Sequence, residues 1–171
     1  MEQKLKWLVL DVDGTMTDGG IYYDEHGNEL KKFSTKDAVG IFAAQQVGIK
    51  LVVLTGRKCK ATERRMGDLK IKYLFQNIIN KEQFLMDFIQ KNEIRKEEIG
   101  YIGDDLNDYR AMKLTGYIGC PADSRAEIKK IADYISAING GDGAVCDIIT
   151  HILKKCEEWN EIIKTMYGVG I

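Results

Sequence analysis

The feature that most limits what this chain can fold into is a regular alternation of short apolar runs with longer stretches of helical period. The apolar runs predict strands at residues 7–11, 50–54, 72–75, 100–103, 117–119 and 133–135. Between them, helices are predicted at residues 37–47, 61–69, 81–91, 105–114 and 124–131. Strands that alternate with helices build a mostly parallel sheet with helices on its faces. The predicted fold class is therefore α/β, with a parallel sheet and flanking helices.

Two segments depart from this alternation. Short strand-like runs at residues 20–23 and 29–33 flank a polar turn, which is typical of a β-hairpin that projects from the main sheet. The last segment, residues 144–171, places apolar residues at spacings of four and three and predicts one long helix before a short tail at 168–171. Its apolar stripe is expected to pack against the domain's own sheet; a contribution to a subunit interface is the alternative.

Length and composition narrow the class of protein. The 171 residues, of which 44% are apolar, fit one domain spanning residues 1–171. The 25 basic and 26 acidic residues nearly cancel, which argues against a nucleic-acid partner. The first apolar run is too short for a signal peptide or for the roughly 20 residues of a membrane span, so a cytoplasmic protein without a membrane partner is expected. The cysteines form no C-x-x-C pair and are expected to be reduced thiols: Cys59, Cys120, Cys146 and Cys156.

Two acidic clusters follow predicted strands at the points where these strands end. Asp11 and Asp13 come at the end of the first strand, and alternation along an extended chain places both on the same side. The second cluster follows the strand near residue 100 and reads Gly103-Asp104-Asp105-Leu106-Asn107-Asp108. Because open α/β sheets bind ligands at the carboxyl ends of their strands, both clusters are expected to face one crevice. A hard divalent cation such as Mg²⁺ would relieve the repulsion between carboxylates this close.

Groups suited to a phosphoryl group lie between the two clusters. Thr55, Gly56 and Arg57 end another strand and supply a hydroxyl, an open backbone amide and a guanidinium. Lys81, at a predicted helix start, can bring a positive charge to the same crevice. A carboxylate there can be phosphorylated as a nucleophile, while Asp13 protonates the leaving alkoxide and later deprotonates water. Each motif alone is also compatible with an ordinary turn or helix start. Their occurrence together, in this order and each after a predicted strand, favours the phosphoryl-transfer chemistry.

These motifs, in this order, resemble those of the haloacid dehalogenase superfamily of Mg²⁺-dependent phosphotransferases, over nearly the whole chain. The resemblance implies a Rossmann-like (haloacid-dehalogenase-like) sheet and a phospho-aspartate intermediate. The site it implies consists of the nucleophile Asp11, the general acid/base Asp13, the metal ligands Asp11, Asp13 (through its backbone carbonyl) and Asp104, the phosphate-binding residues Thr55, Gly56 and Lys81, and the supporting carboxylates Asp105 and Asp108. The spacing of the motifs leaves no room for the cap domain that usually closes such a site.

Capless members that are similar to this chain are the phosphatases of 3-deoxy-D-manno-octulosonate 8-phosphate and of related nonulosonate 9-phosphates. The match extends to residues 17–23, 36–37, 55–58 and 140–145, although the glycine-rich run at 140–143 is also compatible with a plain connection. The similarity implies a homotetramer assembled by the hairpin, with neighbouring subunits covering each active site. It also implies a role in lipopolysaccharide biosynthesis. The candidates for binding the carboxylate of a sugar acid are Arg57, Arg65 and Lys36.

The chain departs from the pattern of this group at two positions. Cys146 stands where an arginine is common, and the group's Arg-Asp-Gly is here Lys36-Asp37-Ala38. Arg57 favours the octulosonate substrate, and a nonulosonate 9-phosphate phosphatase is the alternative. Two readings from other classes are a catalytically silent oligomerisation domain and a phospho-acceptor signalling domain. The intact cluster of Asp11, Asp13, Lys81 and Asp104 argues against the oligomerisation domain. Asp13 argues against the signalling domain, because such a domain needs no acid to protonate a leaving alkoxide.

Overall fold

The computed structural model describes residues 5–170, and its centre is a six-stranded parallel sheet. The strand order is β5-β4-β1-β6-β7-β8, so β1 lies between β4 and β6. The strands are β1 (Trp7–Leu10), β4 (Lys50–Leu54), β5 (Tyr73–Phe75), β6 (Ile99–Ile102), β7 (Tyr117–Cys120) and β8 (Tyr134–Ile135). The predicted α/β fold with a parallel sheet is confirmed, and each strand boundary lies within one residue of its predicted place.

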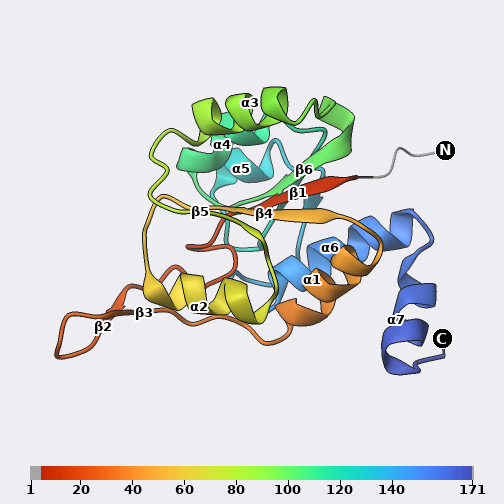
Figure 1. Cartoon of the computed structure of the whole chain (residues 1–171), viewed down its shortest axis with the longest axis horizontal. Helices are drawn as coiled ribbons and strands as arrows, with labels where there is room; N and C mark the ends of the chain where they lie inside the picture. Colours follow the sequence, from red (N-terminus) through yellow and green to blue (C-terminus); the bar gives the residue numbers. More distant parts are fainter. Residues whose placement is uncertain (1–4, 171) are drawn as a thin grey trace.

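Helices cover both faces of this sheet (Figure 1). On one face lie α1 (Asp37–Gln46), α2 (Lys60–Asp68) and α6 (Ala144–Lys155), and on the other lie α3 (Lys81–Lys91), α4 (Leu106–Met112) and α5 (Ala126–Lys129). Alternation along β1 explains the two layers, since Leu8 and Leu10 belong to the core with α1 and α6, whereas Trp7 and Val9 belong to the core with α3 and α4. Because β1 is buried on both faces, its sequence is continuously apolar. A short 3₁₀ turn at Lys96–Glu98 leads into β6 and was not predicted.

The predicted hairpin projects from the sheet at the lower left of Figure 1. Its ladder is shorter than expected, because only β2 (Tyr22–Tyr23) and β3 (Glu29–Leu30) pair, with one further antiparallel bridge between Thr17 and Phe33. The turn is closed by Asp24, whose carboxylate accepts hydrogen bonds from the amides of His26 and Asn28.

The prediction of one long C-terminal helix is wrong. α6 ends at Lys155, and α7 (Trp159–Tyr167) begins after a turn in which Glu157 has a left-handed φ of 59°. Both helices bury apolar residues in the same core, including Ile149 of α6 and Ile162 of α7, so the apolar spacing continues through the break. The stripe therefore packs on the protein's own core, as expected. Of the predicted tail, residue 171 lies outside the described residues.

Three further expectations concern the chain as a whole. All four cysteines are free thiols, as predicted. Among residues 5–170, no helix is long and apolar enough to cross a membrane. Within the same range, the elements also include no cap domain, in agreement with the motif spacing.

Candidate active site

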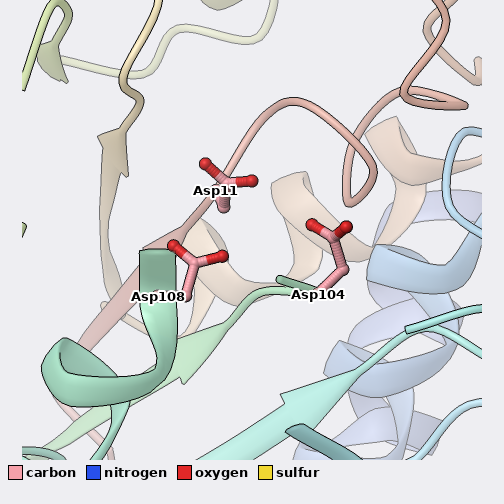
Figure 2. Close-up of side chains that lie close together, drawn as sticks. All are labelled: Asp11, Asp104 and Asp108. Atoms are coloured by element: carbon pink, nitrogen blue, oxygen red, sulfur yellow. The ribbon is translucent and has the colours of Figure 1, made fainter. Parts of the chain in front are cut away.

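Three aspartates gather at the carboxyl edge of the sheet (Figure 2). Asp11 directly follows β1, Asp104 follows β6 after one residue, and Asp108 lies in the first turn of α4. One carboxylate oxygen from each residue lies within 4.8 Å of the other two. Asp11 and Asp108 are buried, and Asp104 is half-buried. The structure thus brings the two acidic clusters of the sequence together in one crevice.

Glycine makes the close approach of these carboxylates to the backbone possible. Gly14 has a φ of +91°, and a Cβ built there would lie 2.2 Å from Oδ2 of Asp104. A Cβ on Gly103 would lie 2.8 Å from Oδ2 of Asp108. The buried hydroxyl of Thr15 donates a hydrogen bond of 2.8 Å to Oδ1 of Asp104. The small residues of both motifs therefore determine where the carboxylates sit.

Lys81 joins two of the three aspartates. Its Nζ lies 2.5 Å from Oδ1 of Asp11 and 2.6 Å from Oδ1 of Asp108, and its side chain is 1% exposed. Asn80 caps α3 by accepting a hydrogen bond from a backbone amide of its first turn, which fixes the start of the helix and hence the position of Lys81. Tyr101 also donates to Oδ1 of Asp108, at 2.8 Å. No sequence signal pointed to Tyr101, because its contact depends on the packing of α4 against β6.

The site has an excess of negative charge. Burial raises the pKa of Asp11 well above its ordinary value, the charge of Asp108 raises it further, and Lys81 opposes both effects. Burial likewise raises the pKa of Asp104 to about 7, although the hydrogen bond from Thr15 acts in the other direction. Burial acts to lower the pKa of Lys81, but the attraction of Asp11 and Asp108 outweighs it and the pKa is raised. The cluster of three carboxylates therefore contains one ammonium group, which contacts only Asp11 and Asp108.

This donor set fits a hard divalent cation. All the converging groups are carboxylate oxygens, which Mg²⁺ prefers, and Oδ2 of Asp108 is buried without a hydrogen-bond partner among the described residues. A cation at this point would favour the ionised forms of Asp11 and Asp104 that burial alone disfavours. The carboxylate of Asp13 is not part of this group, and its predicted contribution as a ligand concerned only its backbone carbonyl.

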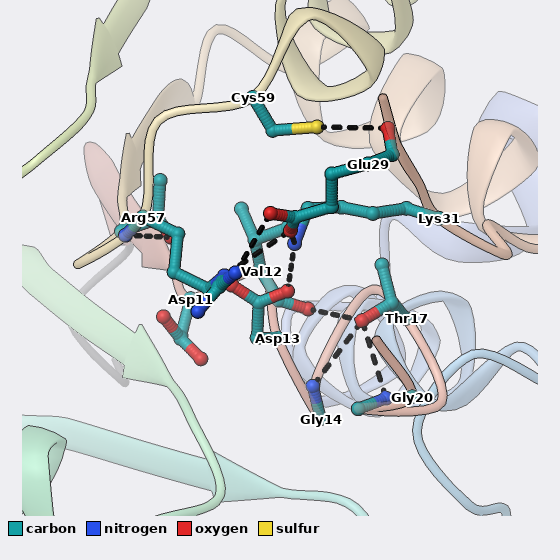
Figure 3. Close-up of polar contacts among 12 residues, drawn as sticks. Asp11, Val12, Asp13, Gly14, Thr17, Gly20, Glu29, Lys31, Arg57 and Cys59 are labelled. Atoms are coloured by element: carbon teal, nitrogen blue, oxygen red, sulfur yellow. Dashed lines mark hydrogen bonds and ion pairs between the residues drawn. The ribbon is translucent and has the colours of Figure 1, made fainter. Parts of the chain in front are cut away.

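The side chain of Asp13 instead meets a chain of charges from the hairpin (Figure 3). Lys31 forms an ion pair with Asp13, and its Nζ also lies 2.9 Å from Oε1 of Glu29. Glu29 in turn accepts two hydrogen bonds from Arg57, of 3.1 Å and 2.7 Å. The hydrogen bonds from Arg57 lower the pKa of Glu29 to about 2. Sequence reasoning missed Glu29 and Lys31, although their i, i+2 spacing in a predicted strand placed both on one face.

The Thr55-Gly56 segment lies at the end of β4, beside β1. Thr55 is buried, its amide donates to the carbonyl of Phe75 at 3.0 Å, and its carbonyl accepts from the amide of Ile78 at 3.1 Å. A Cβ on Gly56 would meet only the carbonyl oxygen of Ile78, at 3.8 Å. The strand end is therefore held firmly while the space above Gly56 stays open, as a phosphate-binding turn requires.

Two of the predicted substrate-binding residues lie outside the carboxylate cluster. Arg65 points toward the segment before α1, where its guanidinium donates a hydrogen bond of 3.0 Å to the carbonyl of Ser34. Lys36 is exposed and lies over Gly143, where an added Cβ would come within 3.2 Å of the Cβ of Lys36. Lys36 thus borders the glycine-rich loop, whereas Arg65 binds the backbone of the segment that precedes α1.

Asp105 also lies outside the cluster. Its carboxylate caps α4 by accepting from the amide of Leu106 at 2.7 Å, and it accepts from Arg125 at 3.0 Å. Its neighbour Asp108 lies one helical turn further on and faces inward. Asp105 therefore contributes to the start of α4 and reaches the other carboxylates only through its charge.

The glycine-rich loop is packed against the loop that follows β1. A Cβ on Gly140 would lie 1.9 Å from the carbonyl oxygen of Gly14, and one on Gly141 would lie 2.4 Å from the amide of Asp18. The amide of Gly141 also donates to the carbonyl of Thr15 at 3.3 Å. These contacts overturn the reading of residues 140–143 as a plain connection.

Fold and site together define a class of protein: phosphotransferases that use aspartates and a divalent cation at the carboxyl edge of a Rossmann-like sheet. The family model of haloacid dehalogenase-like hydrolases matches residues 71–149. The 3-deoxy-D-manno-octulosonate 8-phosphate phosphatase KdsC of Escherichia coli is 38% identical over 159 residues, which cover 91% of this chain and 85% of that protein. The enzyme of the same name from Haemophilus influenzae is 34% identical over 157 residues, 90% of this chain and 87% of that protein.

Solved structures agree with these sequence matches. The crystal structure of 3-deoxy-D-manno-octulosonate 8-phosphate phosphatase from Moraxella catarrhalis, in complex with magnesium, phosphate and the sugar acid KDO, superimposes with a TM-score of 0.90 and 34% identity. The superposition covers 94% of this chain and 92% of that one. The chain therefore belongs to the haloacid dehalogenase-like hydrolases, in the group of phosphoric monoester hydrolases that contains these phosphatases. The resemblance predicted from the motifs is confirmed.

Proposed function

We propose that this protein hydrolyses 3-deoxy-D-manno-octulosonate 8-phosphate to the free sugar acid and inorganic phosphate, with Mg²⁺ as cofactor. The observation that carries the proposal is the cluster of Asp11, Asp104 and Asp108 around Lys81, at the ends of the two central strands. Relatives named for this substrate align over about nine-tenths of the chain. The reaction would be a step of lipopolysaccharide biosynthesis, and the cytoplasmic location predicted from the sequence stays a prediction.

In the first step of the proposed mechanism, a carboxylate oxygen of Asp11 attacks the phosphorus atom. A bond forms between this oxygen and phosphorus, the bond from phosphorus to the sugar oxygen breaks, and Asp13 gives its proton to the leaving alkoxide. Thr55 and Lys81 hold the oxygens of the transferred group. Asp11, Asp104 and the backbone carbonyl of Asp13 would hold Mg²⁺, which would supply positive charge to offset the repulsion between the anionic nucleophile and the anionic phosphate.

In the second step, Asp13 takes a proton from a water molecule that attacks phosphorus. The bond between phosphorus and Asp11 breaks, and phosphate leaves with the carboxylate restored. Asp108 and Tyr101 support this cycle indirectly, because their contacts fix the ammonium group of Lys81 next to Asp11. Apart from the cofactor Mg²⁺ and a water molecule, the proposed reaction uses groups of this chain that lie at or next to the sheet edge.

The substrate's carboxylate needs a cationic partner at the entrance of the site. Arg57 is our first candidate, since Glu29 holds its guanidinium in a bidentate pair beside Asp13 while 41% of its side chain stays exposed. Lys36, beside the glycine-rich loop, and Arg65, bound to the carbonyl of Ser34, remain further candidates. A bidentate guanidinium suits a planar carboxylate better than a lysine does.

We also propose that the chain forms a homotetramer through its hairpin. Four apolar hairpin residues are exposed in the single chain: Ile21 at 53%, Tyr22 at 45%, Tyr23 at 63% and Leu30 at 50%. Several exposed apolar side chains gathered on one projecting hairpin mark an interaction site. Since the site lacks a cap, a neighbouring chain would exclude water from it in the same way as a lid.

Phosphate release in the presence of Mg²⁺ tests the function. The panel contains octulosonate 8-phosphate, a nonulosonate 9-phosphate and hexose phosphates, with Asp11→Asn as the blank and Asp68→Asn as a surface control. We expect turnover of octulosonate 8-phosphate that Asp11→Asn abolishes and Asp68→Asn leaves unchanged. Preference for the nonulosonate ester would change the substrate but keep the chemistry. No Asp11-dependent release from any ester would favour the silent oligomerisation domain.

A further inference from the structure

We infer that Lys31 of the hairpin is a positioning residue for the acid/base Asp13: it holds the carboxylate of Asp13 in the orientation needed to protonate the leaving group. This inference rests on the proposed function. It assigns the hairpin a part in the chemistry in addition to its proposed part in assembly.

The burial of Lys31 is unusual for a residue on an exposed hairpin. Its side chain is 1% exposed, whereas its neighbours Leu30 and Lys32 are about half exposed. Lys32 points outward to Asp142, and Lys31 points inward to Asp13 and Glu29. Figure 3 shows the ammonium group of Lys31 between these two carboxylates. Burying a lysine this completely is unfavourable unless partners compensate its charge, so the inward orientation is built by specific contacts.

Charge compensation continues along a line of four residues with alternating sign. Arg57 pairs with Glu29, Glu29 with Lys31, and Lys31 with Asp13. Because Glu29 also receives Arg57, it cannot turn away to solvent without breaking both pairs. Glu29 therefore anchors Lys31, and Lys31 anchors Asp13.

The geometry at Asp13 shows what this anchoring achieves. Lys31 contacts Oδ1 of Asp13, and 27% of the Asp13 side chain remains exposed. Asp13 stands on a loop after the strand end, where a lone carboxylate can take several rotamers. An acid that protonates a leaving group must lie within hydrogen-bond reach of it, and fixed orientation is a large part of such catalysis. The ion pair fixes one oxygen and leaves the other for the proton transfer.

A series of aryl phosphates with leaving groups of different basicity tests this role. Esters such as p-nitrophenyl phosphate need little protonation of the leaving group, whereas phenyl and methylphenyl phosphates need much more. All of them lack the sugar acid's carboxylate, and kcat/KM reports only binding and the first chemical step. For Lys31→Met, we expect kcat/KM to fall less than about 3-fold for p-nitrophenyl phosphate and about 10- to 100-fold for methylphenyl phosphate. The larger loss is a part of the rate enhancement of about 10²- to 10⁴-fold that general acid catalysis typically contributes.

The controls separate positioning from folding and binding. Lys32→Met removes a neighbouring lysine of the same hairpin and should leave the whole series unchanged. Lys31→Arg keeps the charge and should restore part of the lost rate. In Asp13→Asn, the loss of kcat/KM should grow with the basicity of the leaving group, as in Lys31→Met. The double variant Asp13→Asn/Lys31→Met should depend on the leaving group no more steeply than Asp13→Asn alone. Thermal unfolding of each variant shows whether the fold is intact.

Three results would overturn the inference. An equal loss for all esters in Lys31→Met would mean that Lys31 acts only on the fold or on phosphate binding. An unchanged series would mean that Asp13 needs no such support. A Lys31→Met loss that persists undiminished in the Asp13→Asn background would mean that the two residues act independently. A wild-type protein without Asp11-dependent turnover of any ester would instead overturn the proposed function, on which the inference rests.

Discussion

At the scale of single residues, Thr15 is the side chain on which the position of Asp104 depends most directly. Its hydroxyl donates to the carboxylate at 2.8 Å from a fully buried position. Hydrogen bonds to metal-binding carboxylates change metal affinity by about 10- to 100-fold when they are removed. We therefore predict that Thr15→Val raises the Mg²⁺ concentration for half-maximal activity by at least about 10-fold, measured by Mg²⁺ titration of phosphate release.

The matched control for this prediction is Thr165→Val. Thr165 is exposed on α7 and donates only to a carbonyl of its own helix. Its replacement should leave the Mg²⁺ titration unchanged. A Thr15→Val titration that coincides with the wild-type curve would mean that Asp104 keeps its orientation without the hydroxyl.

Asp37 gives the stability of the protein a specific pH dependence. This residue at the start of α1 is 1% exposed, it accepts from the amide of Cys146 at 3.0 Å, and burial raises its pKa from 3.8 to about 6. Because the pKa is higher in the folded state, the contribution of Asp37 to stability is full below its ordinary value and is lost as the pH rises toward and through 6. Asp37→Asn removes this loss.

Chemical denaturation measures the effect. Between about pH 4 and about pH 7, the free energy of unfolding of Asp37→Asn should rise by about 2 kcal/mol relative to that of the wild type. Asp68→Asn, at an exposed ion pair with Arg64, should show a difference near zero over the same range. Equal pH profiles for the wild type and Asp37→Asn would contradict the assignment.

The sequence predicts some site residues better than others for a physical reason. Asp11 and Thr55 stand at the ends of strands, so local patterning alone places them at one sheet edge. Asp108 points into the site and Asp105 points away from it because of where α4 begins. A run of several acidic residues does not show at which of them the helix starts. Tyr101 contacts the site through the packing of α4 against β6, and Lys31 through the packing of the hairpin against the loop after β1. The sequence carries no local signal for such contacts.

At the scale of elements, the glycine-rich loop and the loop after β1 act as one packed unit. An added Cβ at Gly140 would lie only 1.9 Å from the backbone of Gly14. We predict that Gly140→Ala destabilises the protein by more than about 2 kcal/mol, as overpacking typically does, and that it lowers activity because the loop carrying Asp13 must move. Thermal unfolding and phosphate release measure the two effects.

Gly67 offers the matched substitution. It lies in α2 with nothing within 4 Å of an added Cβ. Gly67→Ala should stabilise the protein by up to about 1 kcal/mol, because alanine has the higher helix propensity. If Gly140→Ala were as stable as Gly67→Ala, the two loops could not be rigidly packed together.

The break between α6 and α7 shows what periodicity leaves undetermined. The turn at Glu157 contains neither glycine nor proline, so the usual signals for a helix end are missing. The finding also changes how the C-terminal segment should be tested. Since α6 packs in the core against α1, a truncation at residue 139 would remove the core residues of both helices, whereas one after residue 157 leaves α6 in place and removes only those of α7, such as Ile162.

At the scale of the whole molecule, the class of fold follows from the alternating pattern but the strand order does not. The pairing of β1 with β4 on one side and β6 on the other joins segments that lie some forty to ninety residues apart. Local patterns contain no information on such neighbours. The same limit applies to the oligomer, which depends on the surface of a second chain.

The proposed assembly gives a prediction at this scale. Ile21→Glu places a charge in the exposed apolar surface of the hairpin and should shift the molar mass, measured by light scattering, from the tetramer toward smaller species. Met86 is exposed to a similar degree, at 47%, but lies on α3, so Met86→Glu should leave the mass unchanged. A wild-type protein that is monomeric at micromolar concentration would rule out the assembly.

The position of Asp11 at the end of the central strand has a consequence for how the protein loses activity. Its amide donates to the carbonyl of Ile102, continuing the ladder between β1 and β6. Amides in such a ladder exchange their hydrogens only when the whole domain opens, whereas those of a short two-stranded ribbon exchange through local opening. Partial unfolding of the hairpin would therefore loosen Asp13 and the substrate entrance while Asp11, the proposed nucleophile, stays in place. If Asp11 has this role, heating should reduce selectivity among phosphate esters before it abolishes the capacity to form the proposed acyl phosphate.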